Sequence, residues 1–173
     1  MKLKDLFLPA YAQMLEALLG QIDKAKHDVQ TAGGSFAELL AARLAPDMFP
    51  LASQIHFVCT QAEEARARLI GEAPDRLDTP ATFDAARTLL ADTVQRLRAA
   101  ATDERLTDQD TAVELALPNG MVFDMTTFEY FKSWSMPQFY FHLVTAYAIM
   151  RNRGIAIGKA DYVPHMFQFL RKT

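Results

Sequence analysis

Apolar side chains recur at spacings of three and four residues in four long segments of the chain. The segments run from about Lys4 to His27, from Phe49-Pro50 to Gly71, from Thr79-Pro80 to Ala101, and from Ser135 to Gly154. This spacing places the apolar residues on one face of a helix. We therefore expect four amphipathic helices of about 18 to 24 residues, each roughly 27 to 36 Å long. Their similar lengths favour an antiparallel bundle.

Proline, glycine and a capping pattern indicate where these helices begin and end. Pro50 suits a first helical turn, where a missing N–H costs nothing, and Gly71 and Gly154 suit helix C-termini. Ser135 and Gln138 have the spacing of a capping box. We therefore expect the fourth long helix to begin at Ser135.

A different pattern separates the third and fourth predicted helices. Apolar residues alternate along 113–117, and Asn119-Gly120 is a strong hairpin signal because both residues accept positive φ. Residues 122–123 would return on the second strand, so we expect a small β-hairpin. We also expect a short helix capped by Ser35 and a short closing helix from Asp161 to Arg171.

Composition bounds the class of protein. The 173 residues are expected to form one domain, residues 1–173, around one hydrophobic core. The formal net charge of −3 predicts binding to neither nucleic acid nor an anionic membrane surface. The most apolar stretch, Phe139 to Met150, is too short to span a bilayer. The single cysteine, Cys59, excludes an intramolecular disulfide and fits a reducing cytoplasm, where we expect the protein to reside.

Two of the four histidines are candidates for a functional site. His56 and His142 fall in the middle of predicted helices among apolar neighbours, whereas His27 and His165 are expected to be solvated. Two neutral imidazoles and a third ligand could form an open Zn²⁺ or Ni²⁺ site. Gln138, four residues before His142, is not a good third ligand. The alternative is that both histidines hydrogen-bond inside the core or a pocket.

Cys59 lies three residues after His56, so the two could form a thiolate–imidazole pair. A buried free cysteine more often acts as a small hydrophobe. No sequence feature predicts a lowered thiol pKa, and this favours the hydrophobic role.

Aromatic residues are dense around the start of the fourth predicted helix. One helical stripe cannot bury all of them within one bundle, so we expect part of the cluster to line a pocket or a homodimer interface. The cluster comprises Phe128, Tyr130, Phe131, Trp134, Phe139, Tyr140 and Phe141.

Two blocks of the sequence resemble a known family. They are RLAPDMFPLASQI, residues 43–55, and PQFYFHLVTAYAIMRNRGIAIGKADY, residues 137–162. With the hairpin, they resemble the domain-of-unknown-function family numbered nineteen-ninety-three, which is similar to the DinB/YfiT-like four-helix-bundle metalloenzymes. The resemblance implies an all-α, DinB-like up-down-down-up four-helix bundle with a small β-hairpin between the third and fourth helices. It also implies a homodimer.

The resemblance further implies a site between the second and fourth long helices. Relatives hold a metal with one histidine on the second helix and two ligands four residues apart on the fourth. These positions correspond to His56, Gln138 and His142. A neutral amide is a weak ligand for Zn²⁺ or Ni²⁺, so Gln138 leaves the metal site incomplete.

Two functions remain open on this sequence. The first is an uncharacterised DinB-like cytoplasmic protein that binds a small molecule in the cleft around His56, Gln138 and His142, without a cofactor. The alternative is a metal-dependent transferase or hydrolase that uses His56 and His142 to hold Zn²⁺ or Ni²⁺.

Overall fold

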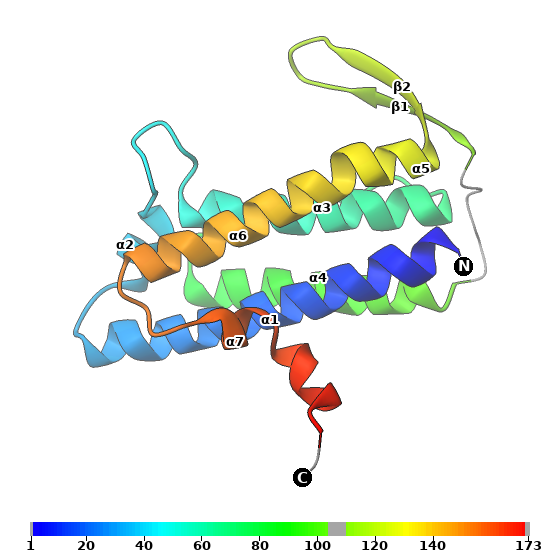
Figure 1. Ribbon diagram of the computed structural model, residues 1–173. Helices are drawn as coiled ribbons and strands as arrows, with labels where there is room; N and C mark the ends of the chain where they lie inside the picture. The colour runs from blue at the N-terminus through cyan, green and yellow to red at the C-terminus, as the bar shows by residue number, and fades with distance from the viewer. Residues whose placement is uncertain (1, 104–109, 172–173) are drawn as a thin grey trace.

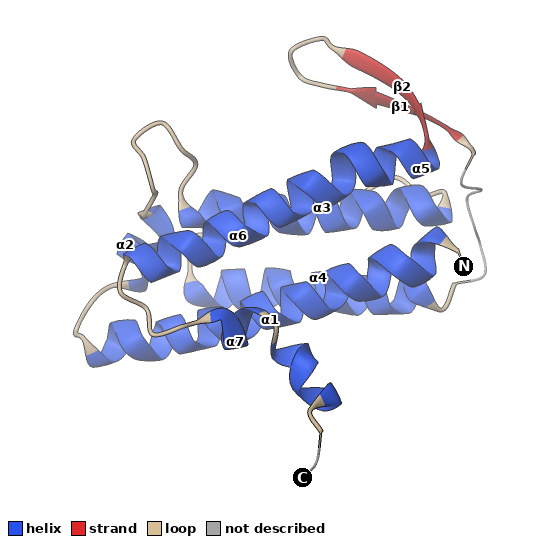
Figure 2. Ribbon diagram, in the orientation of Figure 1, coloured by secondary structure: helices blue, strands red, loops and turns tan. Residues whose placement is uncertain are grey.

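The computed structural model, described for residues 2–103 and 110–171, is mostly helical and carries one two-stranded antiparallel sheet (Figures 1 and 2). Its four long helices are α1 (Leu3–Thr31), α3 (Leu51–Ile70), α4 (Phe83–Ala101) and α6 (Met136–Asn152). α1 and α6 run in one direction and α3 and α4 in the other (Figure 1). The predicted helical class with a small hairpin is confirmed at this level.

The apolar faces of the long helices meet in one core. α1 packs chiefly on α4, and α3 packs on both α4 and α6. Aromatic rings join α1 to the last part of the chain, because Tyr11 stacks on Phe139 at 4.0 Å and Phe7 contacts Phe131 at 4.7 Å between ring centroids. The Tyr11 hydroxyl also hydrogen-bonds the Ser135 hydroxyl at 3.0 Å in the buried core.

A crossover of residues 71–82 joins the parallel helices α3 and α4. Gly71 ends α3 with a φ of 70°, as predicted for a helix C-terminus. Thr82 caps α4, because its side chain accepts a hydrogen bond from the Ala85 amide at 3.1 Å. α4 therefore begins at Phe83 and not at Thr79-Pro80.

The predicted hairpin is present between α4 and the last long helix. β1 (Ala112–Ala116) pairs with β2 (Val122–Thr126) in antiparallel register, with Ala112 opposite Thr126. The Gly120 amide donates to the Leu117 carbonyl at 2.9 Å, and Gly120 has a φ of 86°. Asn119 does not share the positive φ that we predicted, because the loop is longer than a two-residue turn.

The last long helix begins earlier than predicted. It comprises α5 (Thr127–Tyr130), a π-helical turn η1 (Phe131–Ser135) and α6. Its capping box is formed by Thr126 and Glu129, whose side chains each accept a hydrogen bond from the other's amide, at 3.2 and 2.8 Å.

The capping box predicted at Ser135 is therefore wrong. Ser135 has helical backbone angles, φ −58° and ψ −51°, and its side chain makes no capping hydrogen bond. Its hydroxyl instead pairs with that of Tyr11. The π turn ends two residues before Pro137, whose ring would clash with the carbonyl four residues earlier, within this turn, if the helix were regular.

Three short helices complete the described chain: α2 (Phe36–Ala41), α7 (Lys159–Tyr162) and the 3₁₀-helix η2 (Pro164–Phe169). The closing helix predicted from Asp161 to Arg171 is thus two short turns. They are separated at Val163, because the residue before a proline disfavours the α conformation. Within the described ranges, every helix is too short or too polar to cross a membrane.

Candidate functional site

A buried glutamine fixes the orientation of His142 between α3 and α6. Gln54 is 1% exposed, and its Nε2 donates to the Phe49 carbonyl at 3.1 Å. The amide orientation is thereby set, so Gln54 Oε1 is the atom that faces His142 Nδ1 at 2.8 Å. An amide oxygen only accepts, so Nδ1 carries the proton of the neutral imidazole. The free lone pair of His142 is therefore on Nε2.

Burial keeps this imidazole neutral. It lowers the pKa of His142 to about 4, because the charged form is poorly solvated there. The ring contacts Phe57 at 5.0 Å and Phe141 at 5.2 Å between centroids. At neutral pH His142 can thus accept a hydrogen bond at Nε2 but cannot supply a positive charge.

A second polar contact joins α3 to α5, near the start of the last long helix. The Arg68 guanidinium lies 4.6 Å from the ring centroid of Tyr130. Tyr130 is fully buried, and its hydroxyl makes no hydrogen bond that meets normal geometry. Burial and the nearby charge of Glu64 raise the pKa of Tyr130 to about 12. Burial also raises the pKa of the Glu64 carboxyl, although the Arg68 charge opposes this.

These two contacts define a row of polar side chains that we call the α3–α6 seam. α3 and α6 are antiparallel (Figure 1), so residues between Gln54 and Arg68 face residues between His142 and Tyr130. Gln61 lies two turns after Gln54 on the same helix face. Its buried Oε1 has no hydrogen-bond partner. The seam comprises Gln54, Gln61, Glu64, Arg68, Tyr130, Gln138 and His142.

The rings of His56 and His142 share one neighbour, Phe57. His56 is two positions after Gln54, so the two side chains leave α3 about 200° apart around the helix axis. The His56 ring contacts Phe57 at 5.2 Å, and Phe57 in turn contacts His142. His56 Nδ1 is buried without a hydrogen-bond partner. Gln138 is half-buried one turn before His142 on α6.

The residues present do not complete a metal centre. Among the described residues, no group of three or more His, Cys, Asp or Glu side chains is placed to hold a metal ion. Gln54 occupies Nδ1 of His142, which leaves one ring nitrogen for a ligand. We therefore derive no chemical step through a metal.

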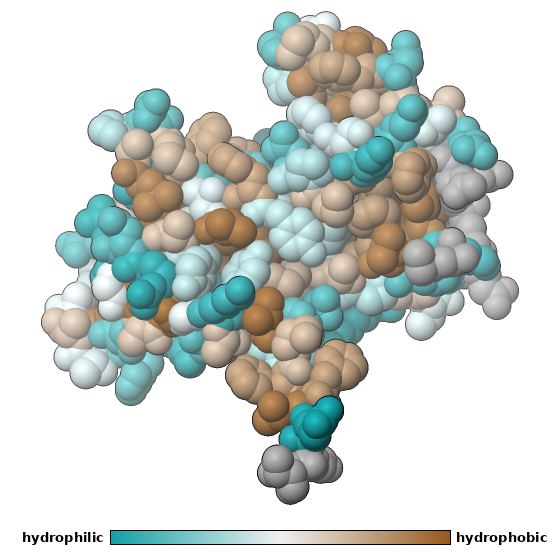
Figure 3. Space-filling model, viewed as in Figure 1, coloured by the Kyte–Doolittle hydropathy of each residue, from teal (hydrophilic) through white to brown (hydrophobic). Residues whose placement is uncertain are grey.

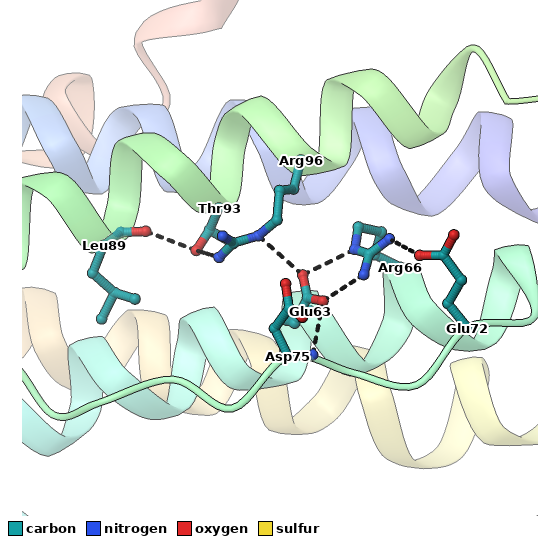
Figure 4. Close-up of polar contacts among 7 residues, drawn as sticks. All are labelled: Glu63, Arg66, Glu72, Asp75, Leu89, Thr93 and Arg96. Carbon is teal, nitrogen blue, oxygen red and sulfur yellow. Dashed lines mark hydrogen bonds and ion pairs between the residues drawn. The ribbon is translucent and has the colours of Figure 1, made fainter.

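Glu63, two turns after His56 on α3, is already fully engaged (Figure 4). Its carboxylate is 1% exposed and accepts hydrogen bonds from Arg66 Nε at 2.9 Å and Nη2 at 2.6 Å. Arg96 Nε, from α4, lies 3.3 Å from Glu63 Oε2, and the Asp75 amide donates to Glu63 Oε1 at 3.2 Å. Burial alone would raise the pKa of Glu63, but these hydrogen bonds and charges outweigh it and hold the pKa low. The contacts of Glu63 with Arg66, Arg96 and the Asp75 amide thus hold the crossover against α3 and α4.

Cys59 and the other two histidines add no reactive group to the seam. Burial raises the pKa of the Cys59 thiol to about 12, even though Thr93 and Arg96 oppose this shift. Cys59 is completely buried, as expected of a small hydrophobe. His27 is exposed as expected, whereas the expectation that His165 is solvated is wrong, because this residue is half-buried in η2.

Gln54, which orients His142 from α3, was not among the residues predicted for the site. Gln54 lies three residues after Leu51 and four before Val58, so it falls on the buried stripe of α3. A polar side chain on an apolar stripe needs a hydrogen-bond partner, so the sequence itself marks Gln54 as a residue that bonds across helices. Gln61, one turn before Ala65, has the same position in the pattern, but its Oε1 has no partner in the structure.

A cavity of about 580 Å³ lies away from the seam, where α1 ends beside α2. Glu38 and Arg153 bring opposite charges to its lining. Asp28, also in the lining, accepts a hydrogen bond from the Ala156 amide at 2.8 Å and so closes the loop after α6. The cavity contains none of the residues predicted for the site.

The helices and hairpin place the chain among DinB-like proteins. It is similar to the crystal structure, at 1.83 Å resolution, of a DinB family member protein from Shewanella denitrificans, with a TM-score of 0.79 and 29% sequence identity. The similarity covers 93% of this chain and 91% of that one. The family described as Domain of unknown function (DUF1993) matches residues 3–163, and the chain belongs to this family. The predicted resemblance is thus confirmed, and no curated protein matches the chain.

Proposed function

We propose that this DinB-like protein binds a small molecule at the α3–α6 seam, where His142 Nε2 accepts a hydrogen bond from the ligand. The observation that carries the proposal is the 2.8 Å contact between His142 Nδ1 and Gln54 Oε1. It selects one tautomer and holds the ring in one orientation. Small-molecule sites commonly combine such precisely placed polar groups with apolar walls, here Phe57 and Phe141.

The polarity of the seam indicates the chemistry of the ligand. Nε2 of a neutral imidazole protonated on Nδ1 only accepts, so the ligand presents a hydroxyl, amide N–H or ammonium group to His142. Gln138, one turn away, can both donate and accept through its amide. The buried Oε1 of Gln61 is a further acceptor that lacks a partner. We therefore expect a polar ligand that carries more than one hydrogen-bond donor.

The pKa of His142 favours binding over proton transfer. A general base works best when its pKa lies near the operating pH. Burial lowers the pKa of His142 to about 4, so the ring is a weak base at neutral pH. A binding module is thus better supported than an enzyme that uses His142 as its base.

A metal-dependent transferase or hydrolase that uses His56 and His142 is the second candidate. It is favoured by the unpartnered Nδ1 of His56 and the free Nε2 of His142. It requires the two rings to approach one Zn²⁺ or Ni²⁺ ion and a further ligand to join them. Metal analysis of protein purified without chelator tests it: about one ion per chain, lost in His142→Ala, would replace our proposal with this one.

Ligand screening tests the binding proposal. Polar metabolites that raise the melting temperature of the wild-type protein should not raise that of His142→Ala. They should raise that of His27→Ala, a matched control in which an exposed histidine is removed. Gln54→Leu should weaken the same ligands, because Nδ1 then loses the acceptor that orients the ring. Ligands that stabilise wild type and His142→Ala equally would place the binding site elsewhere.

We also infer the topology of the bundle, the location of the protein and its partner. The directions of the four long helices in Figure 1 support the up-down-down-up arrangement of DinB-like bundles. The single, buried Cys59 supports a cytoplasmic location, where thiols stay reduced. The net charge of −3 supports neither a nucleic-acid nor a membrane partner. A second copy of the chain is the partner that we expect.

A further inference from the structure

The C-terminal arm, residues 163–170, exposes an unusual amount of apolar surface. It leaves the body of the bundle beyond α7 (Figure 1), and apolar residues gather on this projection (Figure 3). No residue of η2 is buried. Four large side chains of the arm are 54 to 72% exposed: Met166, Phe167, Phe169 and Leu170.

A second set of exposed apolar side chains lies along the last long helix. We call it the α6 face, and it comprises Phe128, Met136, Phe141 and Val144, which are 37 to 56% exposed. A pocket of about 270 Å³ between Val144, Tyr147 and Tyr162 lies on this face beside the root of the arm. An amphipathic surface helix normally turns polar residues to this side.

We propose that the C-terminal arm of one copy docks on the α6 face of a second copy, and that the two copies exchange arms reciprocally. Each chain carries both halves of the contact, so one two-fold axis satisfies both arms. The pocket at Tyr147 and Tyr162 lies at the arm's own root. A two-fold axis near the root therefore brings each arm to the partner's pocket over a short distance.

The root of the arm is anchored in a way that points the arm outward. Asp161 forms an ion pair with Lys24 of α1, and its carbonyl accepts a hydrogen bond from Gln21 Nε2 at 3.0 Å. Its carboxylate also accepts from the Gly158 amide at 2.7 Å. These contacts fix α7 on α1, and Val163 then turns the chain away from the body. The arm thus points away from the body of the bundle and not along its own α6 face (Figure 1).

The exposed areas match the size of a stable dimer interface. With about 200 Å² for a large apolar side chain, the arm exposes roughly 500 Å² and the α6 face roughly 350 Å². The combined area is close to the ~800 Å² that each partner buries in a standard interface. Each surface taken alone has the size of the largest apolar patch on a typical monomer, about 300–600 Å², and such patches are often interaction sites.

Mass measurement by light scattering during gel filtration tests the docking. At about 50 µM the wild-type chain should elute as a dimer. Phe167→Ser with Phe169→Ser should elute as a monomer, and so should Val144→Asp, each with a dimer Kd raised at least a hundredfold. Phe49→Ser removes a side chain that is 58% exposed outside both surfaces, and it should remain a dimer. Circular dichroism should show the same helix content in all of these proteins.

Disulfide trapping identifies which surfaces touch. One chain carries Phe167→Cys and another carries Val144→Cys, and the native Cys59 is too buried to compete. Oxidation of their mixture should produce a covalent dimer if the arm of one copy lies on the α6 face of the other. The proposal is overturned if the wild type is a monomer, or if the dimer survives both sets of surface variants. It is equally overturned if a chain with both cysteines closes the disulfide within a monomer.

Discussion

Replacing Glu63 by glutamine tests how strongly the buried ion pair holds the crossover to the bundle. Glu63→Gln keeps the shape of the side chain but removes the negative charge that Arg66 and Arg96 share (Figure 4). The Arg66 side chain is only 9% exposed, so water cannot readily replace the lost partner. Arg66 keeps an ion pair with Glu72 at 3.0 Å, and Arg96 is 31% exposed.

The structure sets the size of the expected loss. Removing one partner of a buried ion pair typically costs about 3–5 kcal/mol, because the other charge stays buried. The remaining contact of Arg66 with Glu72 and the exposure of Arg96 reduce this cost. We therefore expect Glu63→Gln to lower the free energy of unfolding by about 3 kcal/mol. For a chain of this size that corresponds to a fall of roughly 6–12 °C in melting temperature.

Urea unfolding followed by circular dichroism measures this loss. The matched control is Glu72→Gln. The Glu72 side chain is 39% exposed, so removing its charge should lower the free energy of unfolding by at most about 1 kcal/mol. The pKa of Glu63 is lowered in the folded chain, so its stabilisation is complete above about pH 5 and is lost as the pH falls. The reasoning is refuted if Glu63→Gln loses less than about 1 kcal/mol, or no more than Glu72→Gln.

Four further measurements address the site and the core. The imidazole NMR shifts of His142 should stay constant from pH 8 to about 5, because burial lowers its pKa to about 4; a midpoint near 6.5 would contradict the buried, Gln54-bound ring. Since the unfolded chain protonates this ring below about pH 6.5, stability should fall by roughly 1–3 kcal/mol toward pH 4. Cys59 should not react with a thiol reagent until urea unfolds the chain, and fast labelling of native protein would show that the thiol is accessible. Tyr11→Phe should cost about 1–2 kcal/mol in urea unfolding because it strands the Ser135 hydroxyl, and adding Ser135→Ala should cost little more; full additivity would mean that the 3.0 Å hydrogen bond is not formed.

The candidate site shows where sequence reasoning stops. His142 was identifiable because it is a polar residue in an apolar helix. Its partner Gln54 is 88 residues away in the chain, and only the packing of α3 against α6 brings them together. The grouping of His56 with His142 around one ligand stays a prediction, and in the structure both rings contact Phe57.

The start of the last long helix is a second feature that local sequence rules could not fix. Ser135 has every local feature of a capping residue, with Pro137 and Gln138 following. The capping box at Thr126 and Glu129 is equally visible in the sequence, and local rules do not rank the two. The core decides between them, because the hydroxyl of Tyr11 on α1 engages Ser135 and the helix continues through it.

The sequence alone determined the helical class, the approximate positions of the four long helices, the hairpin and the family. These features depend on periodicity and turn residues, which act over a few neighbours along the chain. The tertiary structure decided which polar groups are partners: Gln54 for His142, Tyr11 for Ser135, and Arg66 and Arg96 for Glu63. Such pairs depend on helix register and rotation, because a buried polar atom must bond to whatever the packing places within about 3 Å.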